Sequence, residues 1–116
     1  MTGIAGEDTQ LLLSAQEFAR RRGWPVEALA NACEEHRIFC LTREGAALYP
    51  EFFVDPKYKV RQLEALSKRL DDLTGGAKWL FMTTGKGSLG GMTPLQALHD
   101  GKFAAVMRAA EGYAER

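Results

Sequence analysis

Apolar residues recur at helical spacing near the start of the chain. Ser14-Ala15-Gln16-Glu17 has the pattern of a capping box and predicts a helix that ends at Gly23, where a left-handed residue favours glycine. Pro25 suits the first turn of a second helix, because the N–H that proline lacks has no partner there. The apolar stripe of this second helix runs to about His36 and consists of Val26, Leu29, Ala30 and Cys33.

The pattern then changes from helical spacing to short β-prone runs. Residues 38–42 are β-branched or apolar, residues 43–45 are typical of a turn, and residues 47–49 are apolar again. This order predicts a small hairpin that ends at Pro50. The aromatic residues of the connector 51–59 are expected to pack under the core.

The second half of the chain returns to helical spacing. Asp55-Pro56 predicts the start of a third helix that Gly75-Gly76 ends, and residues 77–83 form either a short buried helix or a strand. Residues 85–91 are expected to be a loop. Thr93-Pro94 predicts a further helix, interrupted at Asp100-Gly101 before a last helix. The stripe of the third helix consists of Val60, Leu63, Leu66, Leu70 and Leu73.

These elements predict a mainly α protein with a small β-hairpin, an α+β fold. A helix-turn-helix-like part with the hairpin as a wing would occupy residues 14–55 and pack on a helical bundle at 56–116, after a loose N-terminus at 1–13. We expect one compact unit, because 116 residues are a usual size for a single domain.

Composition adds limits on the class of protein. The chain is 46% hydrophobic and 26% charged, and its 15 basic and 15 acidic side chains cancel, so it has no overall field to attract nucleic acid or anionic lipid. The apolar run 11–13 is too short for a signal peptide or a membrane span. A cytoplasmic location is therefore expected, with Cys33 and Cys40 as reduced, buried thiols.

Three candidate chemistries find little support. The spacing Gly85-x-Gly87-x-x-Gly90 matches a dinucleotide-binding loop, but Pro94 restarts helix after it and no second strand follows. Cys33, His36 and Cys40 lack a fourth nearby zinc ligand. The sequence shows no set of nucleophile, base and orienting group that would indicate nucleophilic catalysis. We expect no enzyme, cofactor or metal; an enzyme using residues 85–91 is the least favoured hypothesis.

The spacing of residues 15–36 is typical of a helix-turn-helix with the hairpin as a wing. Ala19 is small enough for close helix crossing. The candidate DNA-binding residues are the phosphate contacts Arg20, Arg21 and Arg22 and the base reader Asn31. Glu27, Glu34 and Glu35 on the second helix would repel phosphates, which argues against strong binding.

Two stretches resemble known families. Residues 14–50 resemble the winged helix-turn-helix of excisionase-like bacterial proteins, through Ser14-x-x-Glu17-x-Ala19-x-x-x-Gly23 and the hairpin. Residues 79–110 resemble the toxin-binding domain of Xre/MbcA/ParS-type antitoxins, through Trp79-Leu80 and the Leu-Gly-Gly-Met-Thr-Pro-Leu segment 89–95.

The second resemblance implies a non-enzymatic, homodimeric antitoxin-like protein whose partner is often a RES-type toxin acting on NAD. We therefore expect a bacterial interaction protein that binds a protein partner, with weak DNA binding as a secondary role. The alternative is a small winged helix-turn-helix DNA-binding protein without a toxin. The expected partner-binding residues are Trp79, Lys86, Ser88, Leu89, Gly90, Gly91 and Met92.

Overall fold

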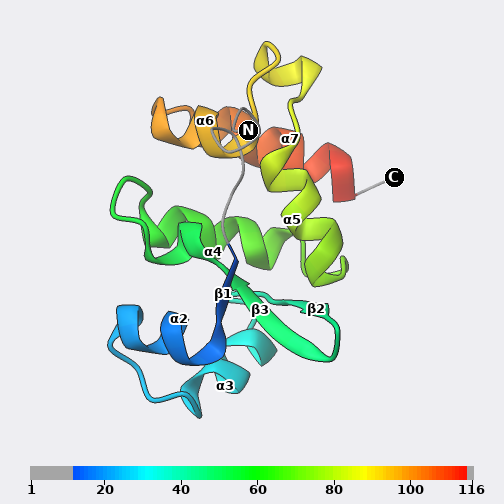
Figure 1. Ribbon diagram of the computed structural model, residues 1–116. Coiled ribbons are helices and arrows are strands. Elements are labelled where there is room, and N and C mark those ends of the chain that lie inside the picture. Colours follow the sequence, from blue (N-terminus) through cyan, green and yellow to red (C-terminus); the bar gives the residue numbers. More distant parts are fainter. Residues whose placement is uncertain (1–11, 115–116) are drawn as a thin grey trace, which may run out of the picture.

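The computed structural model describes residues 12–114 (Figure 1). It is mostly helical with one small antiparallel sheet, which confirms the expected α+β class. The strands are β1 (Leu12–Ser14), β2 (Leu41–Arg43) and β3 (Ala46–Pro50). The helices are α2 (Ala15–Arg22), α3 (Ala28–Glu34), α4 (Val60–Arg69), α5 (Gly75–Thr83), α6 (Pro94–His99) and α7 (Phe103–Ala114), with short 3₁₀ helices η1 (Glu51–Val54) and η2 (Gly87–Leu89).

The predicted hairpin forms, but it belongs to a sheet of three strands in the order β1-β3-β2. Its turn places Glu44 and Gly45 at φ 52° and 81°, the positive values of the two-residue turns that suit hairpins. Strand β1 shows that the end of the expected loose N-terminus, residues 12 and 13, is part of the sheet. The rest of that segment, residues 1–11, lies outside the described residues. Leu13 pairs with Tyr49 across β1 and β3 and is buried, so a short apolar run became a strand.

The first two helices follow the predicted order with two corrections. Ser14 caps α2 by accepting a hydrogen bond from the Glu17 N–H, and Gly23 ends it at φ 75°. The Glu17 carboxylate binds arginines instead of reaching back to Ser14. Pro25 and Val26 form a turn ahead of α3 rather than its first turn, and Val26 is 43% exposed instead of lying on the apolar stripe.

In the second half, Gly75-Gly76 begins a helix rather than ending one. Thr74 caps α5 by accepting a hydrogen bond from the Ala77 N–H. Residues 77–83, for which the sequence left helix and strand open, are therefore helical. The third helix starts at Val60, later than Asp55-Pro56 predicted, and ends at Arg69. The Thr93-Pro94 start is confirmed, since Thr93 and Gln96 form a complete capping box.

One apolar core runs through the molecule. Phe53 is its aromatic centre, with its ring centroid 6.4 Å from that of Phe18, 5.3 Å from that of Phe39 and 5.1 Å from that of Phe52. In Figure 1, α4 and α5 lie between the end formed by the sheet, α2 and α3 and the end formed by α6 and α7. Within residues 12–114, no helix is long and apolar enough to cross a membrane.

Candidate functional site

The end of the molecule that carries α2, α3 and the β2–β3 hairpin contains the predicted DNA-binding residues. Gly23 closes α2, and the Trp24 N–H donates to the Ala19 carbonyl at 3.0 Å, so the chain turns sharply toward α3. Ala19 and Leu29 are buried in the shared core. The hairpin follows α3 after a short connection. The two helices thus share core residues, and the hairpin also contacts α2 through β3.

Arg20 and Arg21 share one carboxylate on the exposed face of α2. The Arg20 guanidinium donates to both oxygens of Glu17, and Arg21 Nε donates to Glu17 Oε2 at 2.7 Å and its Nη1 to Glu51 at 3.0 Å. Hydrogen bonds from the two arginines lower the pKa of Glu17 to about 2. The Arg20 side chain is nevertheless 71% exposed, so it remains accessible to a phosphate.

Arg22 has a different position from its two neighbours. Its guanidinium lies 4.4 Å from the Trp24 ring centroid and 3.6 Å from the Glu64 carboxylate, and its Nε is buried without a hydrogen-bond partner among the described residues. Burial lowers the pKa of this arginine. Arg37 approaches the same ring at 5.6 Å. Arg22 therefore packs against the turn between the helices, and Arg20 and Arg21 are the exposed cations of α2.

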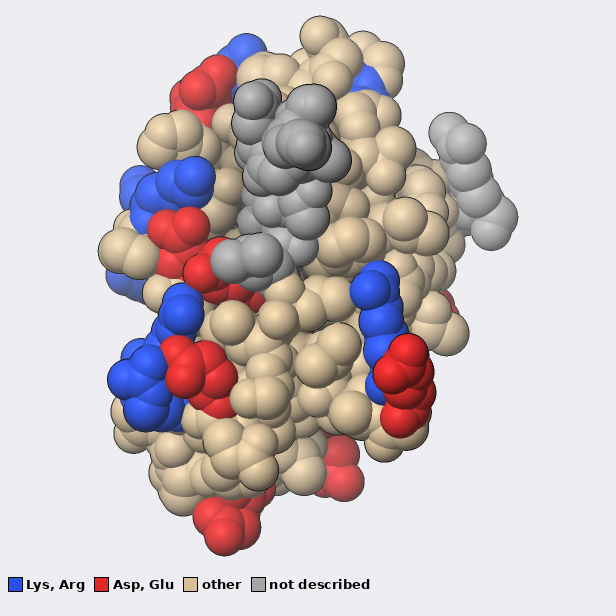
Figure 2. Space-filling view, in the orientation of Figure 1, with Lys and Arg blue, Asp and Glu red and all other residues tan. Residues whose placement is uncertain are grey.

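The exposed face of α3 carries one amide and several carboxylates. Asn31 donates to the Glu35 carboxylate at 3.3 Å, and Glu27 and Glu34 are exposed on the same short segment. Basic and acidic side chains are interleaved on the face seen in Figure 2, without a broad field of one sign. This surface favours local contacts with single phosphates over attraction from a distance.

The predicted partner-binding residues do not form one exposed patch. Leu89 is buried, and Gly90 and Gly91 have φ of 65° and 90°, so the segment has a local structural reason for its glycines. The Trp79 indole N–H is buried without a partner among the described residues, and Met92 is half-buried against the core. Lys86 and Ser88, by contrast, line a surface pocket.

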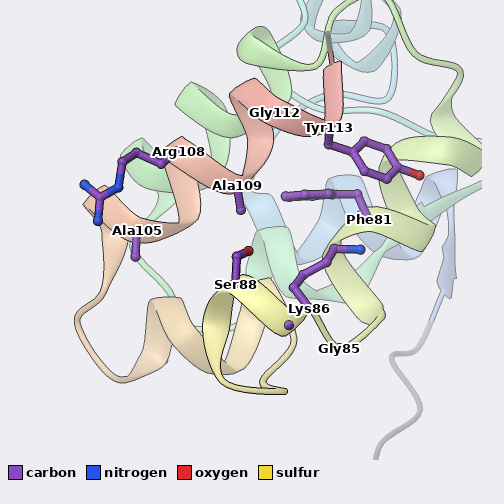
Figure 3. A pocket seen from close by; sticks show the side chains of 10 residues that line it. Phe81, Gly85, Lys86, Ser88, Ala105, Arg108, Ala109, Gly112 and Tyr113 are labelled. Atoms are coloured by element: carbon purple, nitrogen blue, oxygen red, sulfur yellow. The ribbon is translucent and has the colours of Figure 1, made fainter. Parts of the chain in front are cut away.

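That pocket has a volume of about 580 Å³ and lies between the Gly85–Ser88 segment and α7 (Figure 3). Its α7 wall consists of small residues, and the Phe81 and Tyr113 rings close one end with centroids 5.0 Å apart. The Lys86 ammonium lies 4.8 Å and 5.1 Å from these two centroids. Burial lowers the pKa of Lys86. Arg108 is the second cation that lines the pocket.

A second cluster joins the end of α3 to the start of β2. Cys33 and Cys40 are half-buried, not buried as expected, and line one hollow. Lys78 lines the same hollow, and its buried ammonium donates to the Ser67 carbonyl at 3.1 Å. Burial raises the pKa of Cys33 to about 11. Residues 12–114 contain no group of three or more His, Cys, Asp and Glu side chains placed to hold a metal ion.

Sequence reasoning missed two cations. Arg43 is exposed on the β2 side of the hairpin turn and forms no ion pair among the described residues. Its place after a β-prone run and before Glu44-Gly45 is a signal that could have found it. Arg108 lies on the final helix, and only the packing of α7 beside the Gly85–Ser88 segment brings it to a pocket.

Comparison with known proteins gives a fold relative and no family. No model of a known protein family matches the chain, and no curated protein matches it. A solved structure described as "NMR structure of Rv2175c" is similar, with a TM-score of 0.71 and 23% sequence identity over 90% of this chain and 82% of that one. At this identity the likeness concerns architecture, and this chain shares its fold with Rv2175c.

Proposed function

We propose that this protein binds double-stranded DNA through a winged helix-turn-helix formed by α2, α3 and the β2–β3 hairpin. The observation that carries the proposal is the order of elements at one end of the molecule. A helix, a tight turn at Gly23 and a second helix are followed by a hairpin that pairs with β1 through β3. In such proteins the second helix enters the major groove.

The charges support contacts at two separate points of this surface. Arg20 projects from the end of α2, and Arg43 lies at the turn of the hairpin, with α3 between them in the chain. Arginines at these places suit the phosphates that flank a groove, and Asn31 on α3 suits an adenine edge. The ion pair between Arg20 and Glu17 is exposed, so exchanging it for a phosphate costs little.

The carboxylates on and beside α3 determine how strongly we expect the protein to bind DNA. Glu27, Glu34 and Glu35 would lie near the phosphates if α3 enters a groove, and their repulsion opposes the arginines. We therefore expect weak binding by one copy. A homodimer, which would place two such helices on paired half-sites, would bind more tightly than one copy.

Fluorescence polarisation with a short random-sequence duplex tests the proposal. We expect binding at about 50 mM salt that weakens at about 200 mM, with Arg20→Glu and Arg43→Glu each lowering the salt slope by about 1. Lys102→Glu is the charge-matched control, because Lys102 is exposed between α6 and α7. Absence of binding at low salt, or an equal loss in the control, would refute the proposal.

A second candidate function is antitoxin-like binding of a protein partner, such as a RES-type toxin, through the second half of the chain. The observation that favours it is Leu80, a large apolar side chain that is 56% exposed on α5 next to Trp79. Contact with a partner would remove this apolar side chain from water, which is favourable. This candidate places the contact on α5 as well as on the segment 86–92.

Native co-purification followed by mass spectrometry tests the partner. A stoichiometric partner should be recovered with the unchanged chain and lost with Leu80→Asp. Leu80→Asp is a cleaner variant than a change at Gly91, whose φ of 90° would strain any other residue. Recovery of the chain alone, or as a homodimer only, would contradict this candidate.

A further inference from the structure

We propose that the pocket between the Gly85–Ser88 segment and α7 binds a small organic phosphate, a phosphate monoester with a compact organic part. The Gly85–Ser88 segment and α7, which line the pocket, lie at the opposite end of the molecule from α2 and α3 (Figure 1), so the site is separate from the proposed DNA surface. Its volume of about 580 Å³ lies in the usual range for small-molecule sites.

The charges of the pocket select an anion. Lys86 and Arg108 line it, and no Asp or Glu among the described residues does. Neither cation forms an ion pair within residues 12–114. Lys86 instead rests against the rings of Phe81 and Tyr113, partly removed from water, where an arriving anion would gain a strong partner.

The donors present are those that phosphate uses. The Lys86 ammonium and the Ser88 hydroxyl offer several donors beside a positive charge, which suits a phosphate group with its three acceptor oxygens. Figure 3 shows the Ser88 side chain pointing from the loop toward Ala109 across the pocket. Arg108 extends from α7 at the opposite end of the pocket and points away from Lys86, so it adds positive charge there and does not share the phosphate with Lys86.

The walls leave room for more than the phosphate group. Ala105, Ala109 and Gly112 follow one another along α7 and line the pocket with small side chains. A Cβ added at Gly112 would meet nothing within 4 Å, so no contact inside the protein requires glycine at this helical position. The open space beside it would hold the organic part of the ligand.

NMR titration of the full chain tests the site and locates it. The probes are glucose 6-phosphate and adenosine 5′-monophosphate, each compared with its phosphate-free counterpart, and inorganic phosphate. We expect at least one ester to shift the amide signals of residues 85–88 and 105–113 with a Kd below about 1 mM. Its phosphate-free counterpart and inorganic phosphate should each bind at least about tenfold more weakly.

Four variants separate this site from general ion binding. Lys86→Gln should weaken binding at least about tenfold, Arg108→Gln should weaken it less, and Lys102→Gln, outside the pocket, should not change it. Gly112→Leu should fill the pocket and abolish binding while the spectrum stays folded. No shift with either ester at about 10 mM, equal binding of inorganic phosphate, or unchanged binding by Lys86→Gln would overturn the proposal.

Discussion

Gly75 offers the sharpest test of how the two halves of the chain pack. A Cβ built on Gly75 would lie 1.9 Å from the Cys40 carbonyl oxygen and 2.9 Å from its carbonyl carbon. Contact between such atoms needs about 3.5 Å, so Gly75→Ala must push α5 away from the segment that leads into β2 by more than about 1 Å. Both obstacles are backbone atoms, which cannot rotate aside as a side chain can.

The neighbouring residue supplies the control. A Cβ at Gly76 would meet nothing within 4 Å, and both glycines belong to the first turn of α5. Forced overpacking costs about 1–3 kcal/mol, and backbone obstacles place Gly75→Ala near about 3 kcal/mol. Gly76→Ala should instead gain up to about 0.5 kcal/mol from helix propensity, since glycine costs about 1 kcal/mol in a helix interior and less in a first turn.

Urea unfolding followed by tryptophan fluorescence measures both changes in the free energy of unfolding. Thermal unfolding should show Gly75→Ala about 10 °C or more below the unchanged protein and Gly76→Ala at or slightly above it. Equal stability of the two variants would show that α5 does not approach Cys40 this closely. The reasoning would then fail at its first step.

Three further predictions concern a cap, a thiol and the DNA surface. Thr93→Ala removes the capping box of α6 and should lower the free energy of unfolding by about 1 kcal/mol in a urea titration; no change would mean that the cap is not formed in solution. Cys33, with its pKa raised to about 11 from 9.0, should hold about 100-fold less thiolate at pH 8 than an unperturbed thiol. Mass spectrometry after iodoacetamide treatment should find it alkylated far more slowly in the folded than in the urea-unfolded chain, and equal rates would contradict its burial. Glu34→Gln should tighten DNA binding at low salt by removing a repulsive charge from α3, with Asp72→Asn as the charge-matched control; tightening in both variants would indicate a general charge effect instead of contact by α3.

The sequence by itself determined the features that depend on a few neighbouring residues. Ser14 and Gly23 bound α2, Thr93 begins α6 with its capping box, and Glu44-Gly45 makes the hairpin turn. Each of these signals acts within four residues, where a side chain bonds a nearby N–H or a glycine permits a positive φ. The mainly helical class with a small hairpin followed from them.

Tertiary structure decided whatever depends on residues distant in the chain. Leu13 became part of a strand because Tyr49 pairs with it, and Gly75 is needed because the Cys40 carbonyl occupies the space that a Cβ would take. For the candidate site, the sequence placed Arg20 on α2, but only packing brought Glu64 to Arg22 and Arg37 to Trp24. The pocket beside α7 likewise exists only because Lys86 and Arg108, on separate segments, line the same space. Spacing along the chain does not predict such contacts between distant residues, because the packing of the elements around a shared core determines them.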